Sequence, residues 1–206
     1  SMDYEIISEI EKHYTISKIT KKISLQKKNL ASTYFFKNLA QALKKLNLLK
    51  NKHIPEEYLW SSEKQRLTLL QGLMDSDGWV HKEKGNIEFT NTNFKLASGV
   101  KFLLTSLGER CSLTEGKAQL NGKIIGPKWI VKATPEIPVF RLERKLNRQK
   151  LRLGKKSYGS GHLNKFRYII SAEKTEITEM KCIQVSSPDH LYLAGENMIP
   201  THNSML

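Results

Sequence analysis

The feature that most constrains the fold is an apolar run that ends abruptly in a short acidic motif. Arg66-Leu-Thr-Leu-Leu-Gln-Gly-Leu-Met74 has the composition of a helix that is apolar on nearly all sides, and Asp75-Ser-Asp-Gly78 ends it. Ser61 or Ser62, followed by Gln65, offers the chemistry of a helix N-terminus. The sequence therefore predicts one buried helix around which a domain can form.

The rest of the chain is a mixture of helical and strand patterns. Helical spacing predicts a basic amphipathic segment from Asp3 to about Lys50. The other predicted elements are strands at Trp79–Val80 and Ile87–Phe89, a helix from about Asn93 to Leu107 that ends at Gly108, strands at Cys111–Leu113 or Ala118–Leu120 and at Trp129–Lys132, a helix from Phe140 to Leu153, and short strands at Arg167–Ile170, Thr175–Val185, Leu191–Leu193 and Met198–Ile199. A Gly/Ser-rich loop at residues 157–161 predicts a domain boundary there.

The charge of the chain is strongly basic, at +14 for 206 residues, and the basic excess lies before residue 172. Such an excess favours a polyanionic partner, most often nucleic acid, although an acidic protein would satisfy the same electrostatics. The apolar runs are much shorter than the ~20 residues of a membrane span, so no membrane partner is expected. Two cysteines and no secretory pattern at the start favour a reducing, cytoplasmic setting.

The acidic motif places carboxylates at the C-terminal end of its helix, beside the negative pole of the helix dipole. Anions are unfavourable there unless a cation neutralises them, and a hard metal ion is one such cation. Gly72 leaves room for the close approach of a twin helix. The alternative is an ordinary core helix that ends in an Asp-Gly turn.

The motif and its surroundings resemble the second LAGLIDADG motif of intein-encoded homing endonucleases. The similarity lies in Ile54-Pro-Glu-Glu-Tyr-Leu59, Arg66–Gly78, Leu103–Gly108 and Ile137-Pro-Val-Phe-Arg-Leu-Glu-Arg-Lys145, and it extends over roughly residues 35–150. The resemblance implies that Gly72 lies in a close helix contact, that Asp77 binds Mg²⁺ at a scissile phosphate, and that Lys145 is an active-site lysine. It gives Asp75 a structural or capping role.

The same resemblance implies a DNA-facing sheet formed by the strands around Ile87, Phe89, Trp129 and Val131. Double-stranded DNA would be held through phosphate contacts of Arg141, Arg144, Arg148, Lys150 and Arg152. The alternative for these side chains is a solvated basic face. Such enzymes use two motif helices, whereas this sequence carries one, so either two copies dimerise, or the first half is on another polypeptide, or the nuclease is a relic. We therefore expect weak, salt-sensitive DNA binding and no specific cleavage by the chain alone.

A second set of chemical residues lies near the end of the sequence. Cys182-Ile-Gln-Val-Ser-Ser-Pro-Asp-His190 precedes a strand, and Met198-Ile-Pro-Thr-His202 leads directly into Asn203 and Ser204. An asparagine can attack its own peptide carbonyl through its side-chain amide, which forms a succinimide and cuts the chain after itself. A neighbouring histidine can supply the proton that the departing amine needs.

This order of residues resembles the two C-terminal splicing motifs of inteins, over about residues 166–204. The resemblance implies that Asn203 cyclises, that His202 and His190 assist it, and that Ser204, the first extein residue, receives the acyl chain. Cys182 stands where the family often has an aspartate. The alternative to a role in splicing is that Cys182 is a buried thiol of a strand. The N-terminal splicing motif is absent from the sequence, which predicts a C-terminal intein fragment, either naturally split or dissected.

These observations predict an α+β chain with four segments. Residues 1–60 form a basic helical segment and linker, residues 61–160 a LAGLIDADG-type αββαββα half-domain, residues 161–203 the short β-strands of a Hint splicing fold, and residues 204–206 the extein. The predicted function is the C-terminal half of a protein-splicing element, which joins its C-extein host protein to the extein of an N-terminal intein fragment. No cofactor is expected for splicing, and Mg²⁺ is expected for any endonuclease activity. The alternatives are a homing endonuclease subunit or DNA-binding module, and a basic surface that serves only to hold an acidic N-fragment.

Overall fold

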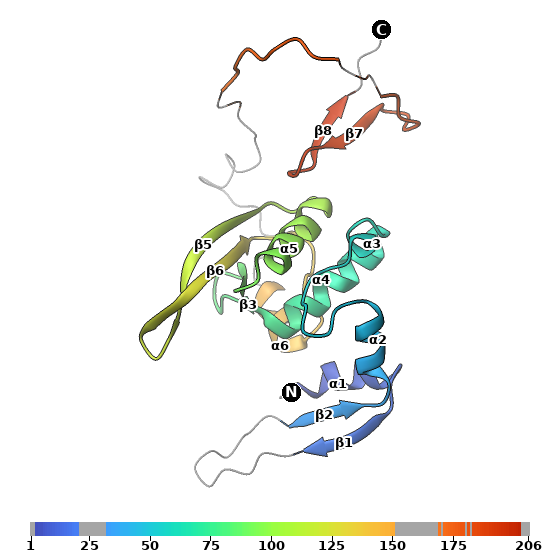
Figure 1. The fold of residues 1–206 in the computed structure, drawn as a ribbon, viewed down its shortest axis with the longest axis vertical. Coiled ribbons are helices and arrows are strands. Elements are labelled where there is room, and N and C mark those ends of the chain that lie inside the picture. Colours follow the sequence, from blue (N-terminus) through green and yellow to red (C-terminus); the bar gives the residue numbers. More distant parts are fainter. Residues whose placement is uncertain are drawn as a thin grey trace. The chain divides into compact units, whose positions relative to one another are not determined.

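The structure is a computed structural model that describes residues 3–20, 32–150, 169, 171–179, 181 and 183–202. The chain divides into two compact units, Ser1–Leu153 and Gly154–Leu206. The elements of the first unit are α1 (Tyr4–Glu11), β1 (Ile16–Thr20), β2 (Thr33–Phe36), α2 (Leu39–Lys45), α3 (Glu56–Leu59), α4 (Glu63–Asp77), β3 (Gly78–Val80), β4 (Ile87–Asn91), α5 (Phe94–Ser106), β5 (Cys111–Leu120), β6 (Lys123–Ala133) and α6 (Glu143–Lys150) (Figure 1). The second unit contains β7 (Leu191–Ala194) and β8 (Ile199–His202). Within these ranges, no helix combines the length and apolar character needed to cross a membrane.

The segment from Asp3 to Lys50 is not the single helical run that its apolar spacing predicted. It forms α1, the antiparallel pair β1 and β2, and then α2. β-Branched and aromatic residues favour strands over helices, and both β1 (Ile-Ser-Lys-Ile-Thr) and β2 (Thr-Tyr-Phe-Phe) are rich in them. The helical spacing of leucines therefore applies only to α2, which follows Asn38 at a φ of 60°.

Helix α4 begins and ends where the sequence predicted. The Ser62 hydroxyl accepts a hydrogen bond from the Gln65 backbone amide, and the Gln65 side chain accepts one from the Ser62 amide, which together form a capping box. At the other end, Asp77 is the last helical residue, and Gly78 starts β3. The acidic motif is therefore the last turn of α4.

A four-stranded antiparallel sheet, in the order β3-β4-β6-β5, follows α4. The β3–β4 pair was predicted. The strands of the β5–β6 hairpin are 10 and 11 residues long, much longer than the short strands that the sequence suggested. Asn121 and Gly122 have φ values of 49° and 79°, and two consecutive positive φ values are those of a tight two-residue hairpin turn.

The core of the first unit lies between this sheet and the helices α4 and α5, which pack on the sheet and on each other (Figure 1). Helix α5 begins after Asn93, close to the predicted start, and the Asn93 side chain caps it; Gly108, the predicted end, follows it at a φ of 83°. The fully buried side chains include Leu70 and Met74 of α4, Val100, Leu103 and Leu104 of α5, Ile87, Phe89 and Val131 of the sheet, and Val139 and Phe140 before α6. The order from α4 to α6 is αββαββα, as expected.

The second unit confirms two of the predicted strands, since β7 and β8 form an antiparallel pair over Leu191–Ala194 and Ile199–His202. The strand predicted over residues 175–185 was wrong for the residues that the structure describes, which lie in no strand. Ile177 is fully exposed, and a strand without pairing or packing partners gains too little to form. The strand predicted at Arg167–Ile170 and the boundary predicted at residue 160 fall almost entirely outside the described ranges.

An ion pair joins the start of α1 to α6. The Arg144 guanidinium donates two hydrogen bonds, each 2.7 Å long, to the Asp3 carboxylate, which lies 141 residues away in sequence. These bonds lower the pKa of Asp3. Because the Arg144 side chain is about half exposed, solvent screens the pair and its contribution to stability is small.

We expect Asp3→Asn to lower the free energy of unfolding by at most about 1 kcal/mol at neutral pH. A carboxylate whose pKa is depressed by folding stabilises the protein above its unfolded pKa, and that contribution is lost as the pH falls through the folded pKa. The difference between wild type and variant in urea denaturation should therefore close as the pH drops below about 4. A difference that stays constant into acid would contradict this role for Asp3.

Candidate functional site

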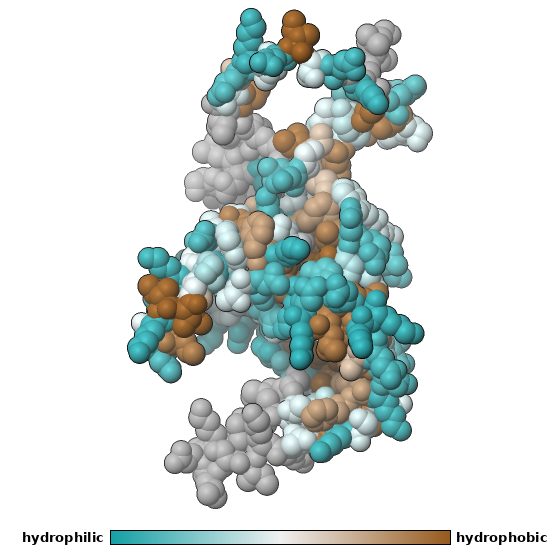
Figure 2. Space-filling view, viewed as in Figure 1, coloured by the Kyte–Doolittle hydropathy of each residue, from teal (hydrophilic) through white to brown (hydrophobic). Residues whose placement is uncertain are grey.

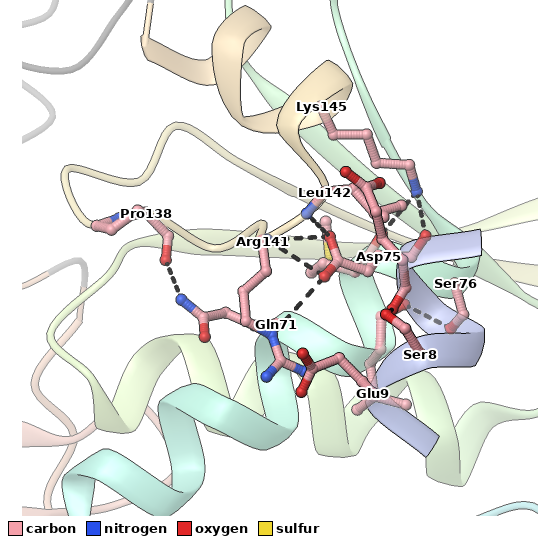
Figure 3. A network of polar contacts seen from close by, with 12 residues as sticks. Ser8, Glu9, Gln71, Asp75, Ser76, Pro138, Arg141, Leu142 and Lys145 are labelled. Atoms are coloured by element: carbon pink, nitrogen blue, oxygen red, sulfur yellow. Dashed lines mark hydrogen bonds and ion pairs between the residues drawn. The ribbon is translucent and has the colours of Figure 1, made fainter. Parts of the chain in front are cut away.

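The two acids of the motif have opposite surroundings. Asp75 is only 6% exposed, and its carboxylate accepts hydrogen bonds of 3.1–3.2 Å from the backbone amides of Arg141 and Leu142 (Figure 3). These amides directly precede α6, and free amides at the start of a helix favour an anion. Asp75 therefore caps the N-terminus of α6 and connects α6 to the end of α4.

Lys145 makes a second connection between the same two helices. Here a side chain of α6 contacts the backbone at the end of α4. Its buried ammonium donates to the carbonyl oxygens of Met74, Asp75 and Gly78, at 2.8, 2.7 and 2.7 Å. An ammonium has three donors, so all of them are used at the C-terminal end of α4. Burial, together with the nearby Arg144, lowers the pKa of Lys145.

This lysine supplies a cation at the helix end where the acidic motif favours one. The motif favoured a metal ion as the neutralising charge, and the resemblance implied that Lys145 is an active-site lysine. In the structure, the ammonium of Lys145 binds carbonyl oxygens in the last turn of α4 directly, which is the favourable position for a cation near a helix C-terminus. Its contacts are those of a residue that holds the last turn of α4 in place.

Asp77 is exposed at the end of α4, and in the described ranges no hydrogen bond or ion pair joins its side chain to another residue. The described part of the chain contains no cluster of three or more His, Cys, Asp or Glu residues that could hold a metal. Mg²⁺ is often bound by one or two carboxylates together with water and substrate phosphates. Asp77 can serve as one such carboxylate ligand, and the remaining ligands would have to come from outside the described residues.

Gly72 does not lie in a close helix contact within the described residues, so the close contact that the resemblance implies would have to be made by a helix of another chain. A Cβ atom placed on Gly72 meets no atom within 4 Å. Gly78, at the end of the motif, is the crowded glycine instead, because a Cβ there would lie 2.6 Å from the carbonyl oxygen of Met74. The motif therefore needs its last glycine for the packing of this chain and leaves Gly72 open.

The arginines and lysines assigned to DNA are partly engaged inside the chain. Arg144 is paired with Asp3, and Arg141 lies 3.9 Å from the Asp75 carboxylate, with Glu9 of α1 beside its guanidinium (Figure 3). Arg148 is half-buried and Lys150 is exposed. Arg152 lies outside the described residues. Two of the predicted phosphate contacts would therefore compete with acids of this chain, Asp3 for Arg144 and Asp75 for Arg141.

The strands expected to face DNA are present, but three of the side chains that marked them face the core. Ile87, Phe89 and Val131 are each 1% exposed. Trp129 is half-buried against Phe94. The side chains that alternate with them lie on the other face and include Trp79, Glu88, Thr90, Thr114, Ile130 and Lys132. Strict alternation along the strands was the signal that could have identified this open face from sequence.

The two histidines of the terminal motif lie together in the second unit. Leu191, which follows His190, pairs with His202 across β7 and β8, and the two imidazole rings are 5.9 Å apart in an edge-to-face arrangement. His190 adopts a φ of 51°, and its Nδ1 atom is buried without a hydrogen-bond partner among the described residues. Asn203, Ser204 and Cys182 lie outside the described ranges.

The turn before His190 is held by Asp189. Its carboxylate accepts hydrogen bonds from the Ser187 hydroxyl and from the Leu191 amide, at 2.5 and 3.1 Å, and these bonds lower its pKa. The Ser187-Pro188-Asp189 turn therefore has a physical role. It fixes the chain direction immediately before the histidine.

The chain is similar to known proteins over much of its length. Residues 64–133 match the family model of a LAGLIDADG-like domain. The replicative DNA helicase DnaB of Mycobacterium intracellulare is 37% identical over 168 residues, which cover 82% of this chain and 28% of that helicase. A structure of mesophilic variants of the homing endonuclease I-DmoI has 14% identity and a TM-score of 0.39, over 73% of this chain and 68% of that one. The chain therefore contains a LAGLIDADG-like domain that spans α4 to β6, and it matches less than a third of the helicase.

Proposed function

We propose that this chain is the C-terminal part of an intein that is inserted in a DnaB-type helicase and carries a LAGLIDADG-like domain. The observation that carries the proposal is the contact between the rings of His190 and His202 at the end of the β7–β8 hairpin, with His202 directly before Asn203 and Ser204. The relative named as a helicase supports the choice of host, because this chain matches only a limited part of that longer protein.

The reaction that this site supports is self-cleavage coupled to splicing. The side-chain nitrogen of Asn203 attacks the Asn203 carbonyl carbon, the bond to the Ser204 nitrogen breaks, and the asparagine becomes a succinimide. The attacking amide loses a proton and the departing Ser204 amine gains one, so a proton relay by His202 balances the step. An acyl chain carried earlier to the Ser204 hydroxyl then moves to the freed amine and leaves a peptide bond.

The partner in this proposal is an N-terminal intein fragment that supplies the upstream nucleophile and its acyl ester. Mixing the two fragments and following the masses of the products tests the proposal. We expect a ligated extein with the wild-type chain and none with Asn203→Ala. His13→Ala is the matched control, because this exposed histidine lies in the first unit. Absence of ligation with the wild type, or ligation unchanged by Asn203→Ala, would overturn the proposal.

We expect the Asn203–Ser204 bond to survive in the chain by itself, because Asn cyclisation accelerates only once the branched intermediate forms. His202→Ala should then leave the resting chain unaffected and slow cleavage by about 10²–10⁴-fold after the partner is added, since general acid catalysis typically contributes that much. Intact mass measured over days checks both parts. Rapid loss of residues 204–206 without a partner would contradict the first part.

A second function, double-stranded DNA binding, rests on different observations. These are the LAGLIDADG-like domain, the basic excess of the chain, and the open face of the four-stranded sheet. Bound Mg²⁺ would supply Lewis-acid stabilisation at a scissile phosphate, with Asp77 as one ligand. We expect the isolated chain to bind DNA weakly, with an affinity that falls as salt rises, and not to cut it specifically.

Plasmid cleavage with Mg²⁺ discriminates a nuclease from a DNA-binding module. The comparison is between wild type, Asp77→Asn and the exposed acid control Glu83→Gln. If wild type and the Glu83→Gln control both cut the plasmid and Asp77→Asn does not, the chain is a nuclease, contrary to our expectation. Binding measured in gel shift at two salt concentrations separates the remaining outcome, an absence of DNA binding altogether.

A further inference from the structure

The tip of the β5–β6 hairpin carries large apolar side chains that no described residue of the first unit covers. Leu120, Ile124 and Ile125 are 61%, 59% and 62% exposed. Figure 2 shows a hydrophobic group at the end of this hairpin with hydrophilic residues around it. Isolated exposed apolar residues are common on protein surfaces, but three of them around one tight turn form a patch that has a function in many proteins.

The hairpin that presents this patch is basic. The hairpin, residues 111–133, contains four lysines, Lys117, Lys123, Lys128 and Lys132, against one acidic residue, Glu115. Lys132 is paired with Glu88 of β4, whereas Lys117 and Lys123 are exposed near the tip. The charge along the hairpin therefore favours a polyanion over an apolar protein surface or a second copy of this basic chain.

The shape of the hairpin selects among polyanions. Two paired strands form a β-ribbon, and a β-ribbon fits the major groove of B-form DNA. The register shifts between Ala118 and Gln119, because Gln119 pairs with Ile124 and Ala118 with Gly126, which leaves Ile125 as an extra residue. A β-bulge of this kind re-aims side chains at the end of a ribbon.

The side chains at the tip match one base pair in particular. In the major groove, the thymine C5-methyl group is the apolar feature, and adenine offers the N6 and N7 atoms that Asn and Gln read. The tip combines apolar Leu120, Ile124 and Ile125 with the exposed amides Gln119 and Asn121. These are the two kinds of contact that an A·T pair accepts.

From these observations, we propose that the β5–β6 tip reads A·T pairs in the major groove by apolar contact with thymine methyl groups. This inference rests on the DNA binding proposed for the chain and adds a sequence preference and the residues that produce it. Removal of one contacted methyl should weaken binding by about fourfold, which corresponds to the burial of one CH₂-sized group.

The probes are an alternating dA·dT duplex of about 30 base pairs and the same duplex with deoxyuridine in place of thymidine, because deoxyuridine lacks only the methyl group. We expect the wild-type chain to bind the dA·dT duplex at least about fourfold more tightly. The double variant Ile124→Ser, Ile125→Ser should bind both duplexes equally, with a salt dependence like that of wild type, because every lysine remains.

Ile19→Ser is the matched control, since Ile19 is an isoleucine of β1 that is 50% exposed and lies away from this hairpin. It should keep the preference for thymine, and thermal unfolding should show that both variants are folded. Binding of both duplexes with equal affinity by the wild type would overturn the inference and leave DNA binding intact. No binding to either duplex at low salt would overturn both proposals. Loss of self-association in the double variant, with DNA binding unaffected, would assign the tip to a second copy instead.

Discussion

Lys145→Met is expected to lower the free energy of unfolding by about 3–5 kcal/mol, the range typical when one partner of a buried charged contact is removed. The substitution keeps the length and apolar stem of the side chain but removes a cation that binds the carbonyls of Met74, Asp75 and Gly78. The Met74 carbonyl keeps the Gly78 amide as a donor, but a buried carbonyl that loses its donor carries a desolvation penalty. Urea denaturation followed by circular dichroism measures the effect.

Lys150→Met on the same helix is the control. Lys150 is exposed, so the loss of its charge should change the stability by no more than about 0.5 kcal/mol. Similar effects of the two substitutions would show that the carbonyl contacts of Lys145 do not stabilise α4. A small effect of Lys145→Met on stability, combined with a strong effect on DNA cleavage, would instead return this lysine to catalysis.

The second large effect is expected from Gly78→Ala, which should destabilise the chain by about 2–3 kcal/mol through overpacking. A Cβ atom there would lie 2.6 Å from the Met74 carbonyl oxygen and 2.8 Å from the Met74 Cα atom. Backbone atoms of a helix cannot move aside as the end of a flexible side chain can. The last turn of α4 would therefore have to shift, and Lys145 would lose its carbonyl partners.

Gly72→Ala supplies the opposite result from the same helix. A Cβ at Gly72 meets open space, and alanine is a better helix former than glycine, so we expect an increase in stability of about 0.5–1 kcal/mol. Thermal denaturation of both variants beside wild type measures the contrast. Destabilisation by Gly72→Ala would indicate that α4 already has a partner helix in solution, through self-association of the chain.

Local chemistry was sufficient to predict α4 and its neighbours. The Ser62 and Gln65 side chains form a capping box with contacts only three residues long, so the start of α4 is encoded in a few positions. The end of α5 is likewise encoded near Gly108. The sequence from Asp3 to Lys50 misled because leucine spacing near α2 was extended over residues whose β-branched side chains pair in β1 and β2.

The candidate sites were predictable in part for the same reason. The order of His190, His202 and Asn203 in the sequence suggested a splicing site, and the strand pairing that brings the two histidines together required only a short hairpin. The roles of Asp75 and Lys145 depend on contacts with residues about 70 positions away. Spacing within a motif contains no information on such partners, so the lysine was assigned by resemblance alone.

The link between Asp3 and Arg144 also has a mechanical consequence. The residue before the first helix of this unit and the start of its last helix lie at nearly the same point, because the Asp3 and Arg144 side chains bind each other across 141 residues. A domain with this arrangement can be inserted into a surface loop of another protein without separating the two ends of that loop, and it tolerates circular permutation. New ends opened at the exposed Asn121-Gly122 turn, with residue 3 joined by a linker to Lys150 at the end of α6, should leave the core contacts and those of Lys145 in place.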